Sequence, residues 1–142
     1  MKARADAVIL APPEAQSGNR SWWTEHTMSY DWKDKIVRQE FSREWFDEVD
    51  RRFIESSRHF AHSDRPFGQI IPFDDIAGKR VLEIGCGMGL HTELMASAGA
   101  QVTALDISPK SVAATRARLA LKDIVADVRE VDAETKIGRA HV

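Results

Sequence analysis

The sequence predicts an α/β fold in which a short parallel sheet follows a helical N-terminal segment. Apolar runs typical of buried strands occur at residues 80–84, 101–106 and 125–131. Helical patterns at residues 90–98 and 108–122 separate these runs. Parallel strands need a crossover connection, so the order strand, helix, strand, helix, strand predicts a parallel α/β arrangement.

Local signals support the boundaries of these elements. A glycine-rich turn, residues 85–89, joins the first strand to the first helix. Gly99 stands where a helix commonly ends in the left-handed conformation. Ser108 and Pro109 then provide an N-cap and a proline at the first position of the second helix.

The first half of the chain has a different character. Residues 1–20 contain Pro12 and Pro13 and few apolar residues after Ala11, and they are predicted to form a disordered leader. Residues 21–75 are predicted to form a helical N-terminal segment.

An amphipathic helix is predicted over residues 39–58. Apolar residues recur there at every fourth position: Phe41, Trp45, Val49 and Phe53. An aromatic cluster precedes the helix: Trp22, Trp23, Tyr30 and Trp32. Two interpretations of this segment stay open, a cap packed against the sheet and a lid that closes over a ligand site.

The composition excludes several classes of protein. The chain has 142 residues with 20 Lys+Arg and 22 Asp+Glu, so its formal net charge of −2 offers no electrostatic footprint for nucleic acid. The sequence has no run of 18 apolar residues, so neither a spanning helix nor a membrane partner is predicted. The single cysteine excludes an internal disulfide and a multi-cysteine zinc site, and a cytoplasmic location is expected.

The glycine-rich turn carries the chemistry. Residues 83–89 read Glu-Ile-Gly-Cys-Gly-Met-Gly at the passage from strand to helix. Such a turn lets backbone approach a ligand, and the following helix N-terminus offers free N–H groups. Asp106 ends the next strand, 21 residues after Gly85, where an acid can bind ribose hydroxyls. These features predict a site for an adenosine-type ligand.

The spacing of the glycines distinguishes between ligands. Gly85 and Gly87 fit the dinucleotide fingerprint, but its third glycine position is occupied by Leu90. The segment 81–89 and the segment 102–108 instead closely resemble the class I S-adenosylmethionine-dependent methyltransferases. Residues 131–134, Val-Asp-Ala-Glu, resemble the acidic turn after that family's third strand.

The resemblance, over about residues 78–134, implies a Rossmann-like, doubly wound parallel sheet of which this chain holds the first three strands. It implies S-adenosylmethionine as cofactor. Its implied cofactor-binding residues are Glu83, Gly85, Gly87 and Gly89 for methionine and ribose, Asp106 for the ribose hydroxyls, and Ile107, Asp132 and Ala133 for adenine. Cys86 belongs to the same cofactor-binding turn, as a small packed residue and not as a nucleophile.

No catalytic residue is assigned from the sequence. A sulfonium methyl is already electrophilic, so the protein mainly aligns the acceptor for in-line displacement. Histidines are candidates for a base by residue type alone, with His91 nearest the glycine turn: His26, His59, His62 and His91. No spacing of ligands predicts a metal site.

The leading functional hypothesis is methyl transfer to a small-molecule acceptor, because the chain lacks a basic surface. A protein acceptor stays open. The alternatives are a non-catalytic cofactor-binding or interaction module and, less favoured, an NAD-dependent dehydrogenase. The oligomeric state cannot be predicted.

The end of the chain departs from the resemblance. Residues 76–135 are predicted to be the first half of a methyltransferase domain, without the later strands of that family. Residues 136–142 are predicted to be a non-native tail, because residues 137–142 match the translation of a widely used sequencing adapter. The chain is therefore expected to be a fragment that is inactive alone.

Overall fold

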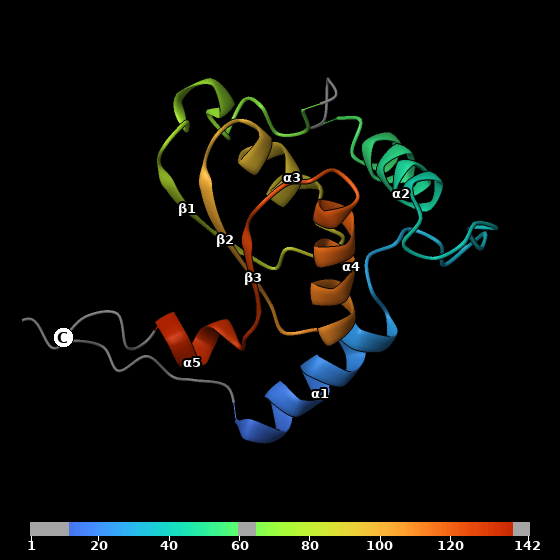
Figure 1. Ribbon diagram of the computed structural model, residues 1–142. Helices are drawn as coiled ribbons and strands as arrows, with labels where there is room; N and C mark the ends of the chain where they lie inside the picture. Colours follow the sequence, from blue (N-terminus) through green and yellow to red (C-terminus); the bar gives the residue numbers. More distant parts are fainter. Residues whose placement is uncertain (1–11, 60–64, 138–142) are drawn as a thin grey trace, which may run out of the picture.

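Three parallel strands form one sheet, as the sequence predicts. The computed structural model describes residues 12–59 and 65–137. The strands are β1 (Arg80–Ile84), β2 (Gln101–Asp106) and β3 (Asp127–Glu130), in the spatial order β1-β2-β3. Since all three run the same way, their carboxyl ends lie at one edge of the sheet (Figure 1).

The register of the sheet decides which residues meet at that edge. Arg80 of β1 lies opposite Gln101 of β2, and Asp106 at the end of β2 lies opposite Glu130 of β3. Asp106 therefore stands at the carboxyl edge of the central strand, the position at which open parallel sheets bind ligands.

Two helices cover one face of the sheet. They are α3 (Leu90–Ser97), between β1 and β2, and α4 (Pro109–Ala120), between β2 and β3. The main core lies between these helices and the strands, and its buried side chains include Met95, Val102, Ala104, Val112, Leu119 and Val128. Burial of this apolar surface supplies the main stabilisation of the sheet.

The predicted helix signals are confirmed. The Ser108 side chain accepts a hydrogen bond from the Ser111 N–H at 3.3 Å, and Pro109 is the first residue of α4. Gly99 follows the last residues of α3 with φ +88°, a conformation that favours glycine.

The N-terminal segment differs from the expectation at its start. Residues 13–20, predicted to be part of a disordered leader, belong to α1 (Pro13–Glu25). Pro12 is the N-cap and Pro13 the first helical residue, where proline loses no hydrogen bond. The two prolines thus mark a helix start and not a loop, while residues 1–11 lie outside the described residues.

The second helix is shorter than the predicted range 39–58. α2 spans Arg43–Ser56 and begins at the N-cap Ser42, whose side chain accepts a hydrogen bond from the Trp45 N–H at 3.2 Å. Phe41 has φ +64°, which is incompatible with a helix at that position. The apolar spacing extends beyond the helix because Phe41 still packs against the same cluster.

α2 packs against α4 on the side away from the sheet (Figure 1). A second core joins them, with Trp45, Phe46 and Val49 of α2 against Ala114 of α4 and Met88 of the glycine-rich turn. α2 is therefore attached both to α4 and to the turn that precedes α3.

The face of the sheet opposite α3 and α4 is partly uncovered among the described residues. Leu82 and Ile84 of β1 are 55% and 53% exposed. Alternate residues of a strand point to opposite faces, so Val81 meets the core while its neighbours do not.

The remaining described segments are short. A 3-10 helix, Phe73–Asp75, precedes β1, and α5 (Ala133–Ile137) follows β3. The first two residues of the predicted tail 136–142 thus lie in α5, and residues 138–142 are outside the described part of the chain. No helix in the described ranges is both long and apolar enough to cross a membrane.

Candidate functional site

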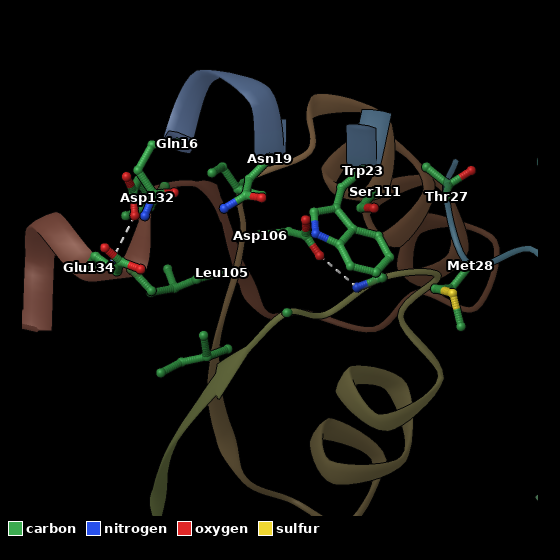
Figure 2. A pocket seen from close by; sticks show the side chains of 16 residues that line it. Gln16, Asn19, Trp23, Thr27, Met28, Leu105, Asp106, Ser111, Asp132 and Glu134 are labelled. Atoms are coloured by element: carbon green, nitrogen blue, oxygen red, sulfur yellow. Dashed lines mark hydrogen bonds between the residues drawn. The ribbon is translucent and has the colours of Figure 1, made fainter. Parts of the chain in front are cut away.

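A pocket of about 370 Å³ opens at the carboxyl edge of the sheet. Its floor comes from the ends of the strands and the loops that follow them, and α1 covers it (Figure 2). The lining residues from the sheet side are Ile84, Gly85, Gly87, Leu105, Asp106, Ile107, Ser111, Val131, Asp132, Ala133 and Glu134.

Asp106 is held in place by two backbone donors. Its Oδ2 accepts a hydrogen bond from the Gly87 N–H at 2.9 Å, and its Oδ1 accepts one from the Ser108 N–H at 2.8 Å. A carboxylate can accept about four hydrogen bonds, so the anchored group keeps acceptor capacity toward the pocket. This arrangement suits the vicinal hydroxyls of a ribose.

The glycine-rich turn is tied to the sheet and to α4. The N–H groups of Gly85 and Cys86 both donate to the Leu105 carbonyl, at 2.7 and 3.1 Å. At Gly89 (φ +80°) an added Cβ would lie 2.9 Å from Thr115 Oγ1. Gly89 is therefore required by the close approach of α4.

The structure divides the predicted site residues into two groups. Six of them line the pocket: Gly85, Gly87, Asp106, Ile107, Asp132 and Ala133. Three lie outside its wall: Glu83, Cys86 and Gly89. Cys86 and Gly89 are buried members of the turn itself, and the Glu83 side chain bonds to α3.

Glu83 is positioned behind the turn. Its Oε2 accepts a hydrogen bond from the Thr92 hydroxyl of α3. Burial raises the pKa of the Glu83 carboxyl above its ordinary value, and the nearby Asp106 charge adds to this effect, although the Thr92 hydrogen bond opposes it. Glu83 thus links β1 to α3 behind the turn.

Cys86 is a packed side chain. Burial raises the pKa of its thiol to about 12, and Thr115 Oγ1 lies 3.5 Å from Sγ. A thiol with so high a pKa carries almost no thiolate near neutral pH, which supports the expectation that it is not a nucleophile.

Two loops close the far end of the pocket. The Val131 N–H donates to the Asp106 carbonyl at 2.9 Å, and Asp132 Oδ1 accepts from the Glu134 N–H at 3.0 Å. With Ile107 these residues form an apolar wall with an acidic edge.

Residues of the N-terminal segment complete the pocket, and the sequence did not predict them individually: Gln16, Asn19, Trp23, Thr27 and Met28. Figure 2 shows Gln16 on the side of Asp132 and Met28 at the opposite end. Arg20 of α1 forms an ion pair with Glu130 at the end of β3. Trp23 belongs to the aromatic cluster noted in the sequence, but no local sequence signal indicated that its side chain would face the sheet.

The histidine candidates within the described residues lie away from the pocket wall. His91 Nε2 is 3.2 Å from the Pro66 carbonyl, its ring contacts Phe53 and Phe67, and burial lowers its pKa. The His26 ring stacks on Trp22 of its own helix. His59 is absent from the pocket lining, and His62 lies outside the described residues.

Metal-binding groups are also absent from the described ranges. No cluster of three or more histidine, cysteine, aspartate or glutamate side chains there could hold a metal ion.

The fold and the pocket together define an α/β protein with a pocket at the carboxyl edge of its parallel sheet. Residues 81–139 match the family model described as a methyltransferase domain. Two solved structures of magnesium protoporphyrin IX methyltransferase from Synechocystis PCC 6803 have the same fold. The structure with bound SAM has a TM-score of 0.57 and 18% sequence identity, and the match covers 87% of this chain and 57% of that chain. The structure with bound SAH has a TM-score of 0.53 and 19% identity, and the match covers 82% of this chain and 51% of that chain.

Curated relatives match part of the chain. A ubiquinone biosynthesis O-methyltransferase from Xanthomonas oryzae pv. oryzae (strain PXO99A) is 57% identical over 42 residues, which are 30% of this chain and 18% of that protein. One from Stutzerimonas stutzeri (strain A1501) is 38% identical over 65 residues, 46% of this chain and 28% of that protein. The chain thus matches less than a third of the length of these relatives.

The matched segment, residues 81–139, is thus similar to methyltransferase domains. The resemblance inferred from the sequence is therefore confirmed, as is the Rossmann-like α/β fold.

Proposed function

We propose that the pocket at the carboxyl edge of the sheet binds S-adenosylmethionine and that the whole protein transfers its methyl group to a small-molecule acceptor. The observation that carries the proposal is the anchored Asp106 carboxylate beside the glycine turn. Asp106 would bind the ribose hydroxyls, and Gly85 and Gly87 would lie along the ribose and methionine.

The opposite end of the pocket suits the base. Ile107 and Val131 offer apolar contact, and Asp132 and the Ala133 backbone lie at the edge where an adenine amino group would be recognised. A volume of about 370 Å³ lies within the range of small-molecule sites.

The chain's own residues supply binding and exclusion of water. The sulfonium of the cofactor supplies the electrophilic methyl group, so the protein need only align cofactor and acceptor. The α1 residues that cover the pocket would shield this region from solvent, which supports the lid interpretation of the N-terminal segment for Trp23.

The acceptor is proposed to be a small molecule. The near-neutral charge offers no nucleic-acid surface, and the curated relatives are named for ubiquinone biosynthesis. A cytoplasmic location fits these observations and stays a prediction.

Calorimetry with S-adenosylhomocysteine on the 142-residue chain tests the cofactor site. Asp106→Ala should weaken binding about ten- to a hundredfold, because two charge-assisted hydrogen bonds to ribose are lost. Asp127→Ala is the matched control, since Asp127 is exposed and pairs with Arg129 on its own strand. Binding of NADH in place of S-adenosylhomocysteine would support a dehydrogenase instead.

A further inference from the structure

A buried ion cluster connects α2 to the glycine-rich turn. Arg118 of α4 is at its centre, with 1% of its side chain exposed. Both of its terminal nitrogens donate to the carboxylate of Asp50 on α2, one of them at 2.9 Å. Its Nε donates to Glu93 Oε2 of α3 at 2.6 Å.

The same guanidinium reaches the cofactor turn. Arg118 Nη1, which binds Asp50, also lies 3.3 Å from the Met88 carbonyl. Met88 directly follows Gly87, whose N–H donates to Asp106 and which lines the pocket. Arg118 is therefore the residue through which α2 contacts the backbone of the cofactor turn.

A neighbouring residue of α4 restrains the turn one peptide earlier. Thr115 Oγ1 donates to the Gly87 carbonyl at 3.0 Å. A trans peptide is planar, so this bond holds the Met88 N–H on the side away from Thr115. Two successive carbonyls of the turn thus accept hydrogen bonds from α4, and these bonds orient the two peptides that directly follow the Gly87 N–H bonded to Asp106.

The ion cluster contains equal numbers of positive and negative groups, and this pairing offsets the cost of removing the charges from water. Glu93 is shared between Arg118 and Lys122, and the Lys122 Nζ lies 2.6 Å from Glu93 Oε1. The two cations Arg118 and Lys122 thus face two carboxylates, those of Glu93 and Asp50. Phe46 of α2 covers the guanidinium, 5.1 Å from its ring centroid. A buried charge that loses one partner is poorly solvated, so Arg118 should move when Asp50 is neutralised.

We infer that Asp50 is a positioning residue for the cofactor: by holding Arg118 against the Met88 carbonyl, it couples the docking of α2 to the conformation of the glycine turn. The inference rests on the proposed cofactor site, although Asp50 lies outside the pocket lining. α2 would then contribute to cofactor affinity without contacting the cofactor.

Asp50→Asn tests the coupling through two measurements. The affinity for S-adenosylhomocysteine should fall about three- to thirtyfold, the range found for coupling through packed networks. Amide hydrogen exchange at residues 87–89 of the ligand-free chain should accelerate, while exchange in β2 stays unchanged. Glu48→Gln is the control, because Glu48 lies on the same helix but pairs with Arg51 and Arg52 outside the cluster.

A second pair of variants separates positioning from stability. In an Arg118→Lys background, which keeps the charge but not the forked donor geometry, Asp50→Asn should cause little further loss of affinity. Asp50→Glu keeps the charge but displaces the carboxylate by one methylene. This variant tests the coupling if Asp50→Asn does not fold. It should also weaken binding at an unchanged melting temperature.

The outcomes separate the inference from the proposed function. A folded Asp50→Asn or Asp50→Glu variant with wild-type affinity and wild-type exchange at residues 87–89 overturns the inference. Failure of the wild-type chain to bind S-adenosylhomocysteine contradicts the cofactor site instead, and the exchange measurement then still decides whether Asp50 controls the turn.

Discussion

Individual residues around the turn show that sequence motif and ligand contact are different properties. Gly87 and Gly89 belong to one motif, but Gly87 lines the pocket whereas Gly89 makes room for Thr115. A glycine pattern therefore combines ligand approach with helix packing, and only the three-dimensional arrangement separates the two.

Cys86 makes this distinction testable. Its thiol pKa is raised by burial to about 12 from an ordinary value of 9.0, so at pH 8 its thiolate fraction should be about a thousandfold below that of an unfolded chain. Reaction with a thiol reagent at pH 8 should therefore be very slow until denaturant is added. Rapid stoichiometric labelling of the folded chain would contradict the buried position.

The same shift has a consequence for stability. Below pH 9 the thiol is protonated in both states, whereas above it the unfolded chain loses a proton that the native state keeps. The contribution of Cys86 to the free energy of unfolding should therefore decline as the pH rises from 9 toward 12. Denaturation of the wild type and Cys86→Ala at pH 8 and pH 10.5 measures this decline.

At the scale of elements, α1 is the part that changes the interpretation of the site. It contributes Gln16, Asn19 and Trp23 to the pocket, and its Arg20 pairs with Glu130. The rest of the N-terminal segment packs elsewhere: Tyr30 and Trp32 contact each other, and Tyr30 packs against Phe53 of α2.

Trp23→Ala distinguishes a lid from a passive cap. The affinity for S-adenosylhomocysteine should fall about three- to tenfold because an aromatic contact is lost, with little change in melting temperature, since Trp23 is 43% exposed. Trp32→Ala is the matched control, because Trp32 lies in the same segment but outside the pocket lining. Equal binding by both variants would favour the passive cap.

The elements differ in how far the sequence could predict them. β1, β2 and α4 begin where predicted because apolar runs and the Ser108-Pro109 start are local signals. α1 was missed because a proline pair such as Pro12 and Pro13 is compatible with a helix start as well as with a loop. The residues after the pair decide between the two, and in this chain they carry no strong apolar periodicity.

The residues of the candidate site also differ in how far the sequence could predict them. Gly85, Gly87 and Asp106 could be predicted because their roles derive from one strand–turn–helix motif and the end of the next strand. Trp23 and Met28 could not be predicted as site residues, because their position depends on how a separate helix lies across the sheet.

For the whole molecule, the described chain is asymmetric about its sheet. α3, α4 and, behind α4, α2 lie on one side, while Leu82 on the other side of β1 is 55% exposed. The apolar burial that stabilises the described part is thus concentrated on one face, and the pocket lies at the carboxyl edge of the sheet.

Two identical substitutions on opposite sides of the sheet measure this asymmetry. Leu119→Ala removes a side chain of α4 that is 4% exposed, and should lower the free energy of unfolding by about 2–5 kcal/mol through lost burial and a residual cavity. Leu82→Ala should cost less than about 1 kcal/mol, because its side chain is already half in solvent and mainly strand propensity is affected. Chemical denaturation of both variants provides the comparison. A cost for Leu82→Ala that equals that of Leu119→Ala would contradict the asymmetry, because it would mean that β1 buries both of its faces.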